Sequence, residues 1–381
     1  MKDFSPARLS VKILFFLNGF IHANYFSRLP RIQEHFAVDN GTLGFVLLSA
    51  SVGALVAMPF TGWMIIRNGS RRVTIFAGYF YCIMVPFIPV VPNVASLVTL
   101  FFVIGISTGM LDVAMNAQAV MVEQQLKKPI MTSFHAFFSV GMMLGALCGS
   151  LFSELGTSLF IHFLSITLMS VAVVFVARYY LIYDKPLKRD DDTPAFRLPN
   201  AAMVSVGVIA FCCMLGEGAM ADWSTNYMEN IAHASQALAP LGLSAFALAM
   251  TIGRILGDQA RVKFGDRMLM ITCGIIAFSG LTLAITFVHP VAVITGFFIV
   301  GIGLSVIVPI AYSIAGNAKD LPPGVGLAMV TTVGYSGFLF GPPIIGFLAD
   351  IFTLRYALVL VLILFALLTW LSARYNSKNG N

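Results

Sequence analysis

A succession of long apolar runs, separated by short polar breaks, constrains this sequence more than any other feature. A helix needs about 20 apolar residues to cross the hydrocarbon core of a bilayer. The runs, bounded by charged residues or by Pro, Gly and Asn, predict six spans in each half of the chain. The predicted spans are residues 11–32, 41–66, 73–91, 96–121, 130–152, 157–182, 200–228, 236–260, 268–288, 291–316, 324–349 and 355–374.

The composition excludes a large soluble module. Hydrophobic residues make up 58% of the chain and charged residues 10%, whereas a soluble domain carries about 25% charged residues. We therefore expect an all-α integral membrane protein whose main surroundings are the lipid bilayer. The first apolar run continues past a possible signal-peptide length without a small-residue cleavage site, so we expect it to remain as the first span.

Charge and cysteine usage limit the possible partners. The net charge is +6, but the Lys and Arg residues are dispersed among loops rather than gathered on one face, so we expect no nucleic-acid partner. The five cysteines lie in apolar segments without the paired spacing of a metal site or a disulfide framework. We expect no metal, no cofactor and a monomeric chain.

The distribution of positive charge predicts the orientation. With both termini on one side of the membrane, 19 of the 23 Lys and Arg residues fall on that side or at the adjoining span ends. Only Arg28, Arg31 and Arg355 lie on the other side, and Arg254 lies within a span. Because cytoplasmic loops carry the excess of Lys and Arg, both termini are expected in the cytoplasm.

The two halves of the sequence resemble each other. A shift of 196 residues pairs Arg67 with Lys263, Arg71 with Arg267 and several glycines with glycines. The repeat predicts two pseudo-symmetric six-helix bundles, residues 1–182 and 200–381, joined by a cytoplasmic linker at 183–199. Parallel six-plus-six repeats occur in one class of transporters, in which the substrate site lies near the midplane between the halves.

Several motifs carry a family resemblance. Gly62, Arg67, Gly69, Arg71 and Arg72 after the second span resemble the loop signature of the major facilitator superfamily, with an echo after the eighth span; Ile66 stands where that signature has an acid. Finer motifs resemble the YbjJ-like bacterial inner-membrane branch, among them Arg28-Leu-Pro30, Phe134-His135, Gly216-Glu217-Gly218 and Gly341-Pro342-Pro343. The resemblance implies a twelve-helix transporter in the bacterial inner membrane, with spans 1, 4, 7 and 10 lining its cavity.

Four ionisable residues fall inside predicted spans: Asp112, Glu217, Asp222 and Arg254. One ionised group at the bilayer centre costs roughly 2.5 to 3.5 kcal/mol on insertion scales, so these groups must face a wet cavity, pair with one another or be neutral. Glu217 lies in the middle of span 7 between two glycines, and we interpret it as the main proton-coupling residue, with Asp222 or Asp112 as its partner. The alternative is that the four residues form structural ion pairs.

Other polar residues are candidates for substrate binding. Asn18, His22 and Tyr25 continue one face of span 1, and Asn116 lies one helical turn after Asp112. Such groups suit a small polar or amphipathic solute. The remaining candidates are Arg28, which could bind an anionic substrate or pair with Asp222 or Glu34, and Trp223, which can equally anchor an interface.

Two further sets of residues are assigned to gating and to helix packing. The gating candidates are Arg67, Arg71 and Arg72, to which Glu123 could bind, together with His135 and Arg254, the last of which could pair with Asp258. The packing candidates lie in spans 5 and 11, where small residues allow close approach and prolines kink the helix. They are Gly141, Gly145, Gly341, Pro342 and Pro343.

Together these features favour a secondary transporter that works by alternating access and is driven by protons. No GxxxxGK[ST] loop is present, so ATP hydrolysis is not expected. The six histidines show no HExxH spacing, and we expect no enzymatic activity. A sodium-coupled or uncoupled facilitator remains open, because Asp112 and Asn116 could coordinate a hard cation, and so does a non-transporting membrane receptor.

Overall fold

The computed structural model describes residues 6–126, 130–184, 201–316 and 325–375, and these residues are helical apart from short connections. Most of the predicted linker lies outside the described residues, and so do nine of the predicted cytoplasmic basic residues: Lys2, Lys127, Lys128, Lys185, Lys188, Arg189, Arg197, Lys319 and Lys378. In chain order the helices are α1 (Pro6–Phe26), α2 (Leu29–Phe36), α3 (Asn40–Asn68), α4 (Ser70–Met84), η1 (Val85–Phe87), α5 (Val94–Leu126), α6 (Met131–Glu154), α7 (Leu159–Ala177), α8 (Ala201–Asn230), α9 (Leu241–Phe264), α10 (Asp266–Thr286), α11 (Pro290–Leu304), α12 (Ile307–Gly316), α13 (Val325–Ile351) and α14 (Leu354–Arg374).

The surface of this helical assembly suits a bilayer. Within the described residues, nine helices or helical stretches are long and apolar enough to cross a membrane, and Leu241–Gly257 of α9 is a shorter apolar helix. Large apolar side chains point outward, and those of Phe60, Leu168, Phe347 and Ile363 are all more than half exposed. Since water would disfavour such a surface, these side chains mark the face that contacts lipid.

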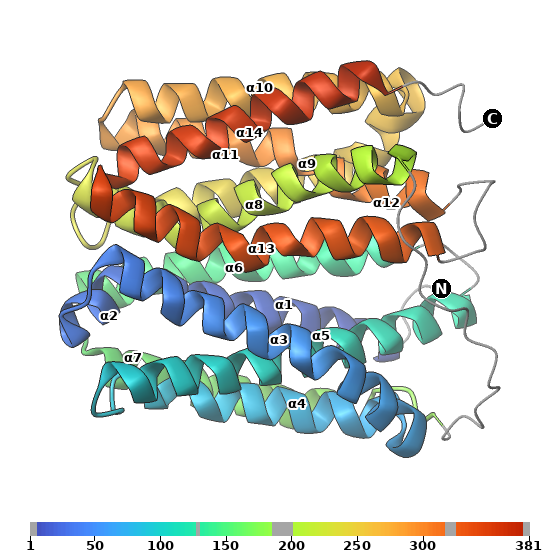
Figure 1. Ribbon diagram of the computed structural model, residues 1–381. Helices are drawn as coiled ribbons and strands as arrows, with labels where there is room; N and C mark the ends of the chain where they lie inside the picture. The colour runs from blue at the N-terminus through green and yellow to red at the C-terminus, as the bar shows by residue number, and fades with distance from the viewer. Residues whose placement is uncertain (1–5, 127–129, 185–200, 317–324, 376–381) are drawn as a thin grey trace.

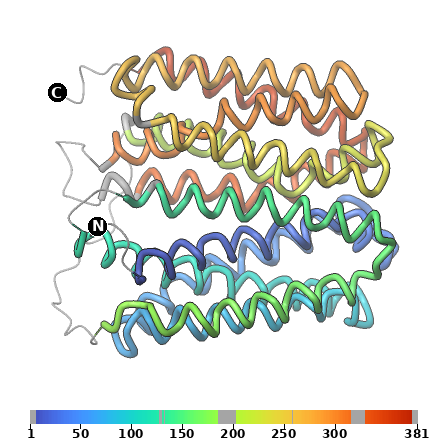
Figure 2. The backbone as a smooth tube through the Cα atoms, turned by 180° about the vertical axis from the view of Figure 1, so that it is seen from behind, coloured from blue at the N-terminus to red at the C-terminus, as the bar shows by residue number. Residues whose placement is uncertain are grey.

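The long helices lie side by side, and the chain runs back and forth between two ends of the assembly (Figure 1). α1 begins and α14 ends at one of these ends, which we call the terminal end. The other, which carries α2 and the connections that follow α4 and α8, is the opposite end. Helices α1–α7 lie together in the lower part of Figure 1 and α8–α14 in the upper part, and the view from behind in Figure 2 agrees. We call these sets the N-terminal and C-terminal groups.

Prolines explain two differences from the predicted spans. The predicted span 11–32 is not one helix, because α1 ends at Phe26 and a separate helix, α2, begins at Leu29 with Pro30 in its first turn, where a missing N–H costs nothing. The predicted span 291–316 is divided between α11 and α12 at Ser305. Ser305 is four residues before Pro309, whose ring lacks an N–H and crowds the carbonyl at that position.

Glycines permit the closest helix contacts within each group. A Cβ atom at Gly141 of α6 would lie 2.0 Å from the carbonyl oxygen of Phe16 in α1, and one at Gly145 would lie 2.4 Å from that of Phe20. In the C-terminal group Gly341 of α13 faces Leu215 of α8. Small residues at such positions allow two backbones to approach each other, which is the expected arrangement in a membrane.

Candidate functional site

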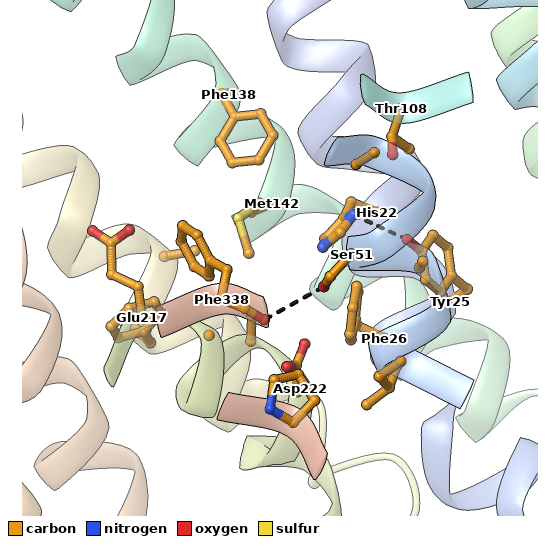
Figure 3. A pocket seen from close by; sticks show the side chains of 18 of the residues that line it. His22, Tyr25, Phe26, Ser51, Thr108, Phe138, Met142, Glu217, Asp222 and Phe338 are labelled. Atoms are coloured by element: carbon orange, nitrogen blue, oxygen red, sulfur yellow. Dashed lines mark hydrogen bonds between the residues drawn. The ribbon is translucent and has the colours of Figure 1, made fainter. Parts of the chain in front are cut away.

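A cavity of about 290 Å³ lies between the two groups of helices and is the candidate binding site (Figure 3). Helices α1, α3, α5 and α6 contribute to it from the N-terminal group, and α8, α9 and α13 from the C-terminal group. Its wall is mainly apolar and aromatic, as is usual for small-molecule sites. The polar side chains that line it are His22, Tyr25, Ser51, Thr108, Ser139, Glu217, Asp222 and Arg254.

An ion pair lies in the wall of this cavity. The guanidinium of Arg254 in α9 is 3.4 Å from the carboxylate of Glu217 in α8, and each side chain is 16% exposed. A second nitrogen of Arg254 donates to the hydroxyl of Ser139 in α6 at 2.6 Å. Arg254 therefore joins the mid-span glutamate to the N-terminal group, and the predicted pair of Arg254 with Asp258 stays a prediction. The side chain of Asp258 lies outside the described part of the structure.

Asp222 is the second carboxylate in the cavity wall, and its surroundings differ from those of Glu217. Its side chain points into the cavity in Figure 3, and the residue is 7% exposed. Among the residues that the structure describes, it has neither a hydrogen-bond partner nor a cationic partner. The predicted pair with Arg28 is not formed: Arg28 donates to the hydroxyl of Ser153 at 2.8 Å and to the carbonyl of Thr157 at 3.0 Å.

Two of the candidate residues of span 1 form a polar pair in the cavity wall. The Tyr25 hydroxyl lies 3.0 Å from Nδ1 of His22, and both residues line the cavity. The ring of Phe26 is tilted against that of His22, with 4.2 Å between the ring centroids. This arrangement places a hydroxyl, an imidazole and an aromatic face on the same side of the cavity (Figure 3).

Several other predicted site residues lie outside the cavity lining. Asn116 bonds to the backbone and carboxylate oxygens of Asp112, one turn beyond Thr108 toward the terminal end. Asn18 is buried within the N-terminal group. The ring of Trp223 is fully buried and packs toward Gly346 of α13 rather than into the cavity. Two consecutive residues of α8, Asp222 and Trp223, therefore face different surroundings.

The predicted gating residues make contacts within the N-terminal group. Arg67 stacks over Trp63 at 4.4 Å, and Arg71 donates to the carbonyl of Arg178 at 2.9 Å, while Arg72 is exposed. Glu123 does not contact these arginines. Its carboxylate instead accepts from the backbone N–H groups of Ile130 and Met131 at the start of α6, at 2.7 and 2.8 Å.

His135, a further gating candidate, is exposed and packs edge-on against Phe15. At the start of α4, the carboxylate of Asp184 accepts from the backbone N–H groups of Ser70 and Arg71. The start of α4 is therefore capped from within its own group.

Contacts between the two groups concentrate at the opposite end. The carboxylate of Asp350, in α13, accepts from the backbone N–H groups of Asn40 and Gly41 at the start of α3, at 3.0 and 2.5 Å. Arg31 of α2 forms an ion pair with Glu229 of α8. The amide of Asn226 in α8 donates to that of Gln33 at 2.8 Å. These contacts hold the groups together on that side of the cavity.

Sequence reasoning missed four of the seven helices that form the cavity in the described part of the structure. It expected spans 1, 4, 7 and 10, and α1, α5 and α8 do contribute, but no lining residue comes from α11 or α12. Instead α3, α6, α9 and α13 supply Ser51, Phe138, Met142 and Phe338, among others. These side chains are common in apolar spans, so nothing in the sequence separated them from lipid-facing or packing residues.

The sequence and the fold agree on the family. The sequence profile of the Major Facilitator Superfamily matches residues 12–318 and 206–379. An uncharacterised MFS-type transporter of Yersinia pestis is 31% identical over 92% of this chain and 91% of its own length. The membrane protein MosC of Rhizobium meliloti is 29% identical over 93% of this chain and 86% of its own.

Solved structures show the same fold. A nucleoside transporter, NupG, superposes with a TM-score of 0.79 at 12% identity and covers 97% of this chain and 99% of its own. A bacterial homologue of the lysosomal transporter Spinster, in an inward-facing conformation, superposes with a TM-score of 0.73 at 14% identity, with 98% of each chain covered. A cavity between two helix groups, in a chain of this fold, defines a polytopic membrane carrier. The chain belongs to the Major Facilitator Superfamily and is a multi-pass membrane transporter of a small-molecule solute.

Proposed function

We propose that the protein is a proton-coupled secondary transporter that moves a small polar or amphipathic solute across the bacterial inner membrane by alternating access. The observation that carries the proposal is the Glu217–Arg254 pair in the wall of a cavity between the two helix groups. The motif resemblance supports the YbjJ-like branch. We also propose twelve spans in two bundles, 1–182 and 200–381, with the linker and both termini in the cytoplasm.

The position of Arg254 supports a coupling role for Glu217. While Glu217 is ionised, its charge holds the guanidinium that also bonds to Ser139 in the other group. Protonation of Glu217 removes that counter-charge, and the contact between the groups changes in strength. A proton can shift a conformational equilibrium only through such a difference in interaction between the two states. Asp222 and Asp112 are the further carboxylates to which the proton or a solute could pass.

The surface charges support the proposed orientation. At the terminal end, exposed aromatic rings carry stacked cations: Arg67 lies over Trp63, Arg178 over Phe175 and Arg374 over Trp370, at 4.0 to 4.4 Å. Aromatic and basic residues gather in this way at a membrane interface. At the opposite end Arg28 and Arg355 bond instead to backbone carbonyls of their own groups. These basic and aromatic residues at the terminal end favour the cytoplasm for that end.

The test uses protein in liposomes that contain a trapped pH indicator. A metabolite panel first identifies solutes whose addition moves protons, and an imposed pH gradient then drives their accumulation. Glu217→Gln is expected to retain solute exchange and lose accumulation driven by the gradient, whereas Glu154→Gln, an exposed acid-to-amide change at the end of α6, is expected to behave as wild type. Accumulation at the wild-type rate in Glu217→Gln would contradict the proposal. The same assay with a sodium gradient tests the sodium-coupled alternative.

A further inference from the structure

The cavity contains two carboxylates and one arginine, and only one of the carboxylates has a partner. Glu217 and Arg254 neutralise each other across 3.4 Å. Asp222 remains, with no cationic partner among the residues that the structure describes. A charge at this depth is costly unless something pairs with it, so Asp222 is the one position in the cavity wall where a positively charged group would be stabilised.

The walls beside Asp222 are aromatic. Phe338 and Phe26 line the cavity together with Asp222, as do Ser51 and the Tyr25–His22 pair (Figure 3). The faces of aromatic rings attract ammonium and guanidinium groups, most strongly where water is excluded. An anionic carboxylate in a cavity lined by aromatic rings is therefore suited to an organic cation rather than to an anion.

The same surroundings disfavour an inorganic cation. Hard metal ions take about six or more oxygen ligands, whereas the polar side chains labelled near Asp222 in Figure 3 are those of Ser51, Tyr25 and His22. Among the described residues no group of three His, Cys, Asp or Glu side chains could hold a metal ion. The cavity volume of about 290 Å³ also leaves room for an apolar body attached to the charged group.

We propose that Asp222 binds the ammonium group of the transported solute, and that the solute is a small amine with an aromatic or alicyclic body. The ammonium lies against the carboxylate of Asp222 and the rings of Phe26 and Phe338, and the body lies against the apolar wall formed by residues such as Met142 and Phe138. This inference rests on the proposed function and gives its substrate class. Glu217, whose charge is already satisfied by Arg254, is left for coupling.

The test is equilibrium binding to the purified full-length protein, measured by calorimetry without any ion gradient. The probes are 2-phenylethylamine, its neutral analogue 2-phenylethanol and its anionic analogue 3-phenylpropionate, together with cyclohexylamine and cyclohexanol. At least one amine is expected to bind about tenfold or more tightly than its neutral analogue, because the charged hydrogen bond to a carboxylate is lost in the alcohol. The anionic analogue is expected to bind most weakly.

Variants then assign the preference to Asp222. Asp222→Asn is expected to bind the amine and the alcohol equally, Asp222→Glu to keep the preference, and the exposed control Glu154→Gln to match wild type. An amine preference that survives in Asp222→Asn overturns the inference, as does the absence of any preference in the wild type. If Asp222→Asn does not fold, as a melting curve would show, the wild-type selectivity and Asp222→Glu decide.

The binding result separates this inference from the proposed function. Amine binding that depends on Asp222, without gradient-driven transport, would contradict the proposed function and leave the amine site standing. Proton-coupled transport of neutral or anionic solutes, with no amine preference, would overturn the amine site alone.

Discussion

The contact between Asp350 and the start of α3 gives a sharp prediction about conformational change. Asp350 belongs to the C-terminal group, and its carboxylate accepts from two backbone N–H groups, of Asn40 and Gly41, in the first turn of an N-terminal helix. The first N–H groups of a helix have no partner within the helix, and the helix dipole favours a negative charge there. Opening the cavity toward the opposite end requires this contact to break.

The magnitude follows from the geometry. Charged hydrogen bonds contribute about 1.5 to 3 kcal/mol, and a carboxylate at a helix N-terminus up to about 2 kcal/mol in partly buried positions. Asp350→Asn removes the charge but keeps one oxygen acceptor, so we expect a loss of roughly 2 kcal/mol, about 30-fold in the equilibrium between the closed and open conformers. A conformer populated at about 1% would then rise to roughly a quarter of the molecules.

The assay is a distance distribution between spin labels at Val90 and Phe287, which are 56% and 59% exposed in the connections at the opposite end of the two groups. The five native cysteines are replaced first. Asp350→Asn is expected to add a longer-distance population. The matched control is Asp39→Asn, because Asp39 caps the same helix through the N–H of Thr42 at 2.7 Å but belongs to the same group. An unchanged distribution in Asp350→Asn, or an equal change in Asp39→Asn, would refute the reasoning.

Three further predictions test packing, gating and topology. Gly141→Ala places a methyl group 2.0 Å from a backbone oxygen and is expected to lower the melting temperature, because overpacking costs about 1 to 3 kcal/mol. The control Gly62→Ala meets nothing within 4 Å and should leave the melting temperature unchanged. Equal melting temperatures of the two variants would show that the helices separate freely. Neutralising Arg67, Arg71 and Arg72 together is expected to favour the conformer that is open at the terminal end, measured by cysteine labelling in the cavity, and unchanged accessibility would count against this gate. Reporter fusions within 183–199 are expected to report the cytoplasm, and a periplasmic signal would reject the proposed topology.

The mid-span acids illustrate what can be predicted locally. Glu217 could be singled out because a charge within a membrane span is costly whichever way the helix is rotated about its axis. The structure places Glu217 in the cavity wall, paired with Arg254. Local spacing offers only Asp258 as a neighbour of Arg254, since residues four apart are adjacent on any helix, whereas the contacts of Arg254 with Glu217 and Ser139 join three helices. Helix rotation depends on packing against other helices, which no local pattern encodes.

The sequence by itself determined that the chain is an α-helical membrane protein of the major facilitator type, because span length, small-residue stripes and loop signatures are local properties. The tertiary structure alone decided which residues face the cavity. Asp222 and Trp223 are adjacent, yet one points into the cavity and the other packs against α13. Phe26, Phe338 and Met142 line the cavity although similar residues elsewhere face lipid. In a chain that is apolar on nearly all helix faces, hydrophobicity does not separate a lipid contact from a binding wall, and only the arrangement of helices in space makes that distinction.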